Sequence, residues 1–299
     1  MKARMLTCCL ASLLLLLGCQ KKEAVSFDAT RAMGYVRDIV AFGPRPIGTP
    51  GHAKTEDYIL QHLRSIGAQT ETDEFTAATP AGPLRMRNLI AKIPGEKEGA
   101  IVIGSHYETN YPLRNFVGAN DGGSTSGLLL ELANQLQRKD KKLPGHSVWL
   151  VWFDGEEAIE SWSSTDSLYG SRHLAEKWQK DGTLKQVRAF ILTDMIGDAD
   201  LNIERDLNSN KDLQTLVFQA ASNLGYQAHF FGREVAVQDD HLPFVNAGVR
   251  AIDLIDLDYG PQNSFHHTPE DTMDKLSTQS LEIAGRTVLE AVRLLGSSK

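Results

Sequence analysis

Continuous apolar runs of strand length alternate with amphipathic helical segments through most of this chain. Residues 100–105 (AIVIGS) and 147–153 (SVWLVWF) are runs typical of central strands covered on both faces. The alternation of helices and strands after these runs predicts an α/β domain with a mostly parallel sheet. The predicted elements are a helix between those two runs at 124–137, a helix at 168–178, a strand at 189–193, a helix at 213–224, a strand at 249–255 and a helix at 278–295.

Two helices and a strand pair precede this alternation. One helical pattern starts at Asp28 and stops at Gly43-Pro44, and a second opens at Pro50-Gly51. Residues 69–74 and 86–93, joined by a segment with Pro and Gly, favour an antiparallel pair at the sheet edge. We therefore expect residues 28–299 to form a single three-layer αβα domain around a central mixed, mostly parallel twisted sheet.

The N-terminus has the layout of a secretory signal. Lys2 and Arg4 precede an apolar stretch from Met5 to Leu17 that is too short to span a bilayer. The stretch ends in Leu-Leu-Gly-Cys at 16–19, which resembles the lipobox of bacterial lipoproteins, where the cysteine is acylated and becomes the first mature residue. The alternative is an ordinary cleaved signal with a chance cysteine.

The lipobox resemblance implies that residues 1–18 are a lipoprotein signal peptide, that Cys19 carries the lipid, and that residues 19–27 are a short tether. The protein is then expected in the bacterial cell envelope, outside the cytoplasm and held by its lipid without spanning the membrane. The other two cysteines, Cys8 and Cys9, fall within the signal, so the folded part has no disulfide. The formal charge of −7 and the lack of a long basic run argue against a nucleic-acid partner.

Residues of metal-ligand type follow the predicted strands. In open α/β sheets, ligands bind at the carboxyl ends of the strands, so polar residues at these points are candidates for a site. Zinc is held by His nitrogens and carboxylate oxygens, and two His with three carboxylates can hold one or two ions. The candidates are His106, Asp121, Glu156, Glu157, Asp194 and His267.

The adjacent Glu156 and Glu157 need a particular explanation. Two carboxylates at the buried end of an apolar strand repel each other and are costly to desolvate without a cation. We expect Glu157 to bind zinc and Glu156 to remain free as a general acid and base. The alternative is an exposed acidic loop.

Five segments resemble the zinc aminopeptidases with an α/β fold. The resemblance implies that Asp121, Glu157 and His267 hold one zinc and that His106 and Asp194 are able to take a second. Glu108 departs from the family pattern, which has Asp at the position that orients the His. The segments read HYE at 106–108, ANDGGSTSG at 119–127, DGEEA at 154–158, LTDMIG at 192–197 and HHTPEDT at 266–272.

Two further segments resemble the animal-type glutaminyl cyclases, which are related to these aminopeptidases. They are EEAIESWSSTDSLYGSRHLA at 156–175, with Trp162 as the discriminating residue, and DDHLPF at 239–244. The resemblance implies that the substrates are peptides or proteins with a free N-terminal Gln, which is closed to pyroglutamate with release of ammonia. It implies that Trp162 bounds the substrate slot and that Asp239 joins Asp194 in a carboxylate pair sharing a proton.

The pocket departs from the animal cyclases at two positions. Asp253 stands where they have a His, and His266 stands where they have a Trp before the late zinc ligand. His266 is therefore the expected substrate-binding residue at that point. Three readings remain open: a cyclase, a zinc aminopeptidase in which Glu156 activates water and Trp162 only packs, and an inactive envelope lipoprotein that binds a partner.

Overall fold

The structure, a computed structural model, describes residues 26–113, 115–138 and 141–297. The predicted signal peptide, Cys19 and the tether up to residue 25 lie outside the described residues. Among the helices that the structure describes, none is long and apolar enough to cross a membrane.

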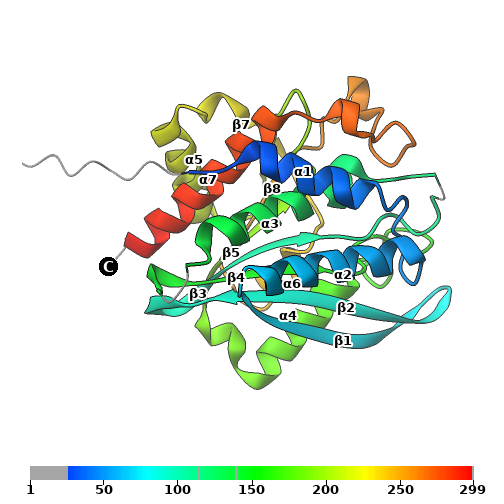
Figure 1. The fold of residues 1–299 in the computed structure, drawn as a ribbon, viewed down its shortest axis with the longest axis horizontal. Coiled ribbons are helices and arrows are strands. Elements are labelled where there is room, and N and C mark those ends of the chain that lie inside the picture. The colour runs from blue at the N-terminus through cyan, green and yellow to red at the C-terminus, as the bar shows by residue number, and fades with distance from the viewer. Residues whose placement is uncertain (1–25, 114, 139–140, 298–299) are drawn as a thin grey trace, which may run out of the picture.

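A six-stranded mixed sheet forms the centre of the fold (Figure 1). Its order is β1-β2-β4-β3-β5-β8. The β1/β2 and β2/β4 pairs are antiparallel, and the remaining pairs are parallel, which confirms both the mixed sheet and the antiparallel edge expected from the sequence. The strands are β1 (Gln69–Thr79), β2 (Gly82–Ile93), β3 (Gly95–His106), β4 (Leu143–Phe153), β5 (Val187–Asp194) and β8 (Ala251–Ile255).

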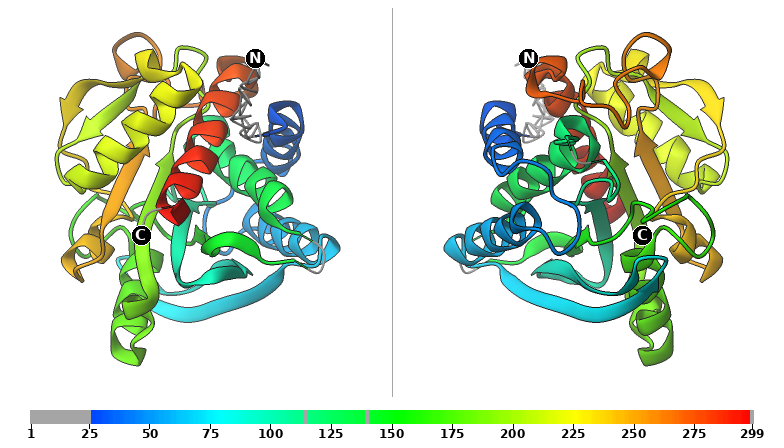
Figure 2. Two further views of the ribbon diagram at one scale, coloured as in Figure 1. Left: turned by 90° about the vertical axis from the view of Figure 1, so that its left-hand side faces the viewer. Right: turned by 90° about the vertical axis from the view of Figure 1, so that its right-hand side faces the viewer.

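Helices cover both faces of this sheet, so the predicted three layers are present (Figures 1 and 2). Alternate strand residues explain the layers, because Ile101 and Ile103 of β3 join one buried cluster whereas Ala100 and Val102 join the other. The first cluster includes α1 (Ala29–Val40), α2 (Pro50–Ser65), α3 (Thr125–Leu136), α5 (Lys211–Leu224) and α7 (Thr278–Ser297), and the second includes α4 (Tyr169–Asp181) and α6 (Leu242–Asn246).

A small parallel sheet and helix α6 were not predicted. The sheet pairs β6 (Ile203–Asp206) with β7 (Phe230–Val235). The sequence IERD of β6 has neither the length nor the alternation of a strand, and much of β7 is exposed, so hydrophobic pattern could not reveal them. This sheet matters because β7 leads directly into the loop that carries Asp239.

Candidate active site

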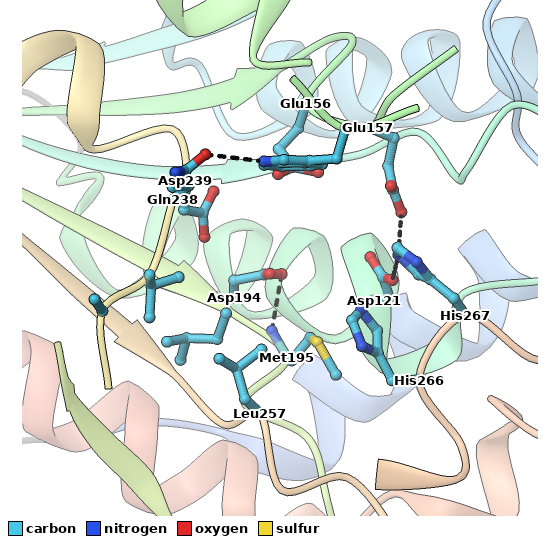
Figure 3. Close-up of a pocket in the computed structure, with 14 residues that line it drawn as sticks. Asp121, Glu156, Glu157, Asp194, Met195, Gln238, Asp239, Leu257, His266 and His267 are labelled. Carbon is cyan, nitrogen blue, oxygen red and sulfur yellow. Dashed lines mark hydrogen bonds and ion pairs between the residues drawn. The ribbon is translucent and has the colours of Figure 1, made fainter. Parts of the chain in front are cut away.

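A cavity of about 530 Å³ opens at the carboxyl end of the parallel strands (Figure 3). The structure brings together there nearly every residue that the sequence singled out. His106 lies just beneath the lining, with 2% of its surface exposed. The predicted residues that line the cavity are Asp121, Glu156, Glu157, Trp162, Asp194, Asp239, His266 and His267.

His267 faces two carboxylates across one corner of the cavity. Its Nε2 lies 2.8 Å from Glu157 Oε1 and 3.2 Å from Asp121 Oδ2 (Figure 3). Ligand atoms around a tetrahedral zinc at about 2.1 Å lie about 3.4 Å apart, so small side-chain movements would admit the ion. Apart from this imidazole, both buried carboxylate oxygens lack a hydrogen-bond donor among the described residues. The three side chains thus fit a metal ion.

The second oxygen of Asp121 faces another possible ligand set. His106 Nε2 lies 3.1 Å from Asp121 Oδ1 and 3.3 Å from Asp194 Oδ1. The ligand atoms of these three residues all lie within 4.8 Å of one another. Asp121 therefore stands between two imidazoles and can bridge two positions. Although burial by itself would raise the pKa of Asp121, its hydrogen bonds with His106 and His267 hold that pKa well below its usual range.

The turn that presents Asp121 depends on its glycine and on Asp271. Gly122 has φ +73°, and a Cβ there would lie 2.7 Å from the Glu108 carbonyl oxygen and 3.0 Å from the His106 ring. The Asp271 carboxylate accepts the backbone N–H groups of Asn120 at 2.8 Å and Asp121 at 3.1 Å. Segments far apart in sequence therefore fix the same turn.

Arg45 holds this turn through hydrogen bonds to its backbone. Its side chain is fully buried, and its guanidinium donates to the carbonyl oxygens of Tyr107 at 2.9 Å, Val117 at 2.5 Å and Gly118 at 3.0 Å. Burial lowers the pKa of Arg45 to about 10. The nearby negative charges of Asp121 and Asp271 act in the other direction and limit this decrease. The arginine joins the end of β3 to the turn that carries Asp121.

Replacing Arg45 by Met is expected to reduce the free energy of unfolding by about 3–5 kcal/mol, because several buried carbonyls lose their donors. Arg85→Met is the matched control, since Arg85 is an exposed arginine 3.1 Å from Glu74 and surface pairs contribute at most about 1 kcal/mol. Urea denaturation of both variants measures the difference. Equal losses would show that Arg45 is no more important to stability than a surface arginine.

Glu108 does not orient His106 in the way the family pattern suggests. His106 Nδ1 lies 3.8 Å from Glu108 Oε2, and neither atom has a hydrogen-bond partner among the described residues. Instead, Glu108 Oε1 accepts the backbone N–H of Glu157 at 3.1 Å. The longer side chain thus reaches past the imidazole and supports the Glu157 backbone.

Glu156 and Asp239 are buried carboxylates on the cavity wall. Burial raises the pKa of Glu156 well above its usual value, and the charges of Asp239 and Glu157 add to this. Burial also raises the pKa of Asp239, with the charge of Asp194 as the next cause. Asp239 Oδ2 has no hydrogen-bond donor among the described residues. A proton shared between Asp194 and Asp239 stays a prediction.

Trp162 and His266 form parts of the cavity rim and wall. Trp162 is 41% exposed, and its Nε1–H donates to Gln238 Oε1 at 3.3 Å. The His266 ring lies tilted against that of His267 with centroids 4.0 Å apart, and its Nδ1 lies 3.2 Å from Asn263 Nδ2. His266 thus lines the cavity beside a candidate metal ligand.

Two residues of the site have backbone conformations that side chains disfavour. Met195, which follows Asp194, has φ +51°, and His267 has φ +52°. Such conformations cost on the order of 1 kcal/mol each and persist when surrounding contacts impose them. The N–H of Met195 donates to Asp194 Oδ1 at 2.9 Å, which is one such contact.

Motif residues outside the cavity have structural contacts. His241 is fully buried, with Nε2 3.0 Å from Asp206 Oδ2, so it ties the Asp239 loop to β6. Asp253 is also fully buried, 3.8 Å from His241 Nδ1, at the position where animal cyclases have a His. Burial, followed by the charge of Asp239, raises the pKa of Asp253 well above its usual value.

Sequence reasoning did not identify Arg45, Asp271 or Gln238. Arg45 and Asp271 act through backbone groups of distant segments, which no local pattern reveals. Asp271 lies within the motif HHTPEDT, so its place beside the late His was the available signal.

Comparison with known proteins agrees with this site. Residues 88–292 match Peptidase family M28. The glutaminyl-peptide cyclotransferase of Drosophila melanogaster is 33% identical over 267 residues, which covers 80% of this chain and 75% of that protein.

Solved structures of a glutaminyl cyclase and of a zinc-dependent exopeptidase are similar to this chain over most of its length. An Acidobacteriales bacterium glutaminyl cyclase is 54% identical with a TM-score of 0.87, covering 90% of this chain and 95% of that one. A Zn-dependent exopeptidase from Parabacteroides distasonis is 27% identical with a TM-score of 0.80, covering 91% and 99%. The chain therefore belongs to peptidase family M28 and, within it, to the glutaminyl cyclases.

Proposed function

We propose that this protein is a zinc-dependent glutaminyl-peptide cyclotransferase that converts N-terminal Gln of peptides or proteins to pyroglutamate and releases ammonia. The observation that carries the proposal is the meeting of three features in one cavity: a candidate metal-ligand set, the buried Glu156 and the rim residue Trp162. The similarity to a glutaminyl-peptide cyclotransferase and to a bacterial glutaminyl cyclase supports it.

Asp121, Glu157 and His267 are the proposed zinc ligands, because the imidazole Nε2 and one oxygen of each carboxylate converge, and nitrogen and oxygen donors of these types suit zinc. His106 and Asp194, with Asp121 as the bridge, are the proposed ligands of any second ion. Zinc bound at this corner supplies Lewis-acid polarisation of the γ-amide carbonyl of the substrate Gln.

Glu156 is the proposed general base and acid. In the reaction, the α-amine of the substrate forms a bond to the γ-carbonyl carbon, and the bond from that carbon to the amide nitrogen breaks. Glu156 accepts a proton from the attacking amine and gives one to the departing ammonia, so no water is consumed. Glu156 lines the cavity with 6% of its surface exposed, which leaves it accessible to a substrate held there.

Four other residues are proposed to complete the site. Asp194 and Asp239 share a proton, so that they do not both carry a negative charge beside Glu156, which the raised pKa of Asp239 favours. Trp162 and His266 are the proposed substrate-binding residues, because both line the cavity and aromatic rings with polar edges suit contacts with a small substrate side chain.

The experiment that tests the function uses the zinc-loaded protein without residues 1–19, a Gln-initiated peptide and a matched Leu-initiated peptide, with products followed by mass. Loss of ammonia from the Gln peptide alone is the expected result. Release of free Leu would identify an aminopeptidase, the second reading that the family and the exopeptidase-like fold support. Inertness toward both peptides would favour the partner-binding lipoprotein.

We also propose that acylated Cys19 holds the enzyme at a membrane of the bacterial cell envelope. The Leu-Leu-Gly-Cys sequence at the end of the apolar stretch supports this. Cys19→Ser is expected to move the protein from the membrane fraction to the soluble fraction and to abolish labelling by a fatty-acid analogue, whereas Cys8→Ser leaves both unchanged. Membrane association of the Cys19 variant would contradict the lipid anchor.

A further inference from the structure

The segment from Glu156 to Leu168 forms a loop that is closed at its base. The Leu168 N–H donates to the Glu156 carbonyl oxygen at 2.7 Å, and the Tyr169 N–H donates to that of Gly155 at 2.7 Å. A compact loop whose ends are held together in this way is an Ω-loop. We call residues 156–168 the Trp loop, because it begins at the proposed base Glu156 and places Trp162 at the cavity rim.

The carboxylate of Asp166 organises the interior of the Trp loop. Its Oδ1 accepts the Ile159 N–H at 2.8 Å, and its Oδ2 accepts the N–H groups of Glu160 and Ser161 at 2.9 Å each. The hydroxyl of Tyr169 donates to Oδ1 at 2.8 Å. Burial opposes these bonds, yet together they hold the pKa of Asp166 below its usual value. Three successive backbone amides are thus fixed just before Trp162.

The far side of the loop is fixed to α4. The Arg172 guanidinium donates to the Ser167 carbonyl oxygen at 2.8 Å and to that of Thr165 at 3.3 Å. The same guanidinium lies 4.9 Å from the centroid of the Tyr169 ring. These contacts hold the segment that carries Asp166 against the helix, so the position of the Asp166 carboxylate is fixed relative to α4.

Trp162 itself has little packing to hold it. Its side chain is 41% exposed, and its bond to Gln238 at 3.3 Å joins two exposed side chains. An exposed bond of this length contributes about 1 kcal/mol or less. The position of the indole therefore depends on the backbone just before Trp162, which is the part that Asp166 holds.

We infer that Asp166 is a positioning residue for glutamine cyclisation: its carboxylate binds three backbone amides of the Trp loop so that Trp162 bounds the substrate slot beside Glu156. This inference rests on the proposed function, since it assigns Asp166 an effect on the Gln substrate. Asp166 does not line the cavity, so it acts through Trp162.

The decisive experiment is a double-mutant cycle of Asp166→Ala and Trp162→Ala in the zinc-loaded protein. Asp166→Ala is expected to raise KM for a Gln-initiated peptide about tenfold with a smaller change in kcat, because the slot is misplaced while Glu156 and the metal ligands remain. In the double variant, the loss in kcat/KM should equal that of Trp162→Ala alone. Additive losses would overturn the inference.

Two further variants distinguish positioning from general loss of structure. Asp166→Asn keeps one acceptor oxygen and is expected to fall between wild type and Asp166→Ala, with unchanged zinc content. Tyr169→Phe removes one donor but none of the three backbone bonds, so its KM should stay near the wild-type value. Loss of zinc from Asp166→Asn, or equal effects of the Tyr169 and Asp166 variants, would contradict the proposed role.

Tryptophan fluorescence tests the loop independently of catalysis. Trp162 is 41% exposed, whereas Trp149, Trp152 and Trp178 are at most 8% exposed, so acrylamide quenching reports mainly on Trp162. Quenching should change in Asp166→Ala and remain as in wild type in Tyr169→Phe. Unchanged quenching in Asp166→Ala would overturn the inference. If the wild-type protein produced no pyroglutamate, the proposed function would fail while this measurement still decided what Asp166 holds.

Discussion

Substituting Glu156 by Gln is expected to lower kcat for pyroglutamate formation by about 10²–10⁴-fold, the usual contribution of a positioned general acid and base. Gln has nearly the same shape but cannot take a proton from the attacking amine. KM should change little, because Glu156 is not among the proposed zinc ligands. The measurement is steady-state ammonia release from a Gln-initiated peptide.

Glu160→Gln is the matched control for this variant. Glu160 is an exposed glutamate in the same loop, and only its backbone N–H contacts Asp166. It should retain wild-type kcat. Zinc content must be measured in both variants, since a Glu156→Gln protein that had lost zinc would show a structural effect and not a chemical one. Full activity of Glu156→Gln would place the base elsewhere.

Metal removal is expected to have the second large effect. A chelator should abolish activity and lower the melting temperature by roughly 6–16 °C, since zinc at 100 to 1,000 times its Kd stabilises the fold by about 3–4 kcal/mol. The reason is local: Asp121, Glu157 and Asp194 are buried together and need a cation to balance them. Calorimetry with and without added zinc measures the shift.

The His267→Ala variant tests which atoms hold the ion. Its melting temperature should no longer respond to zinc, because the imidazole that faces both Asp121 and Glu157 is gone. His146→Ala is the control, since His146 lies at the sheet's other end and its Nδ1 contacts only the Glu98 carbonyl in the described structure. A zinc-dependent shift that survives in His267→Ala would assign the ion to the His106 group instead.

The sequence was informative wherever a residue directly follows a strand. His106 and Asp194 end β3 and β5, and Glu156 closely follows β4, so parallel pairing alone brings them to one edge. The strands themselves were predictable because both faces of each are buried, which leaves long apolar runs.

Supporting residues were less predictable for a physical reason. Arg45, Asp166 and Asp271 bind backbone N–H or carbonyl groups, which every sequence possesses at every position. A side chain that recognises backbone leaves no complementary residue to find. Gln238 is similar, since its place opposite Trp162 depends on the unpredicted β7.

The closed base of the Trp loop has a consequence for how such enzymes can diversify. Because Glu156 and Leu168 are joined by a hydrogen bond, the chain between the proposed zinc ligand Glu157 and Leu168 can be exchanged as a cassette without moving the ends of β4 or α4. The internal contacts of Asp166 travel with the cassette, so a grafted loop carries the means of holding its own shape. Selectivity among family members can then change by loop exchange while the metal-binding floor is inherited intact.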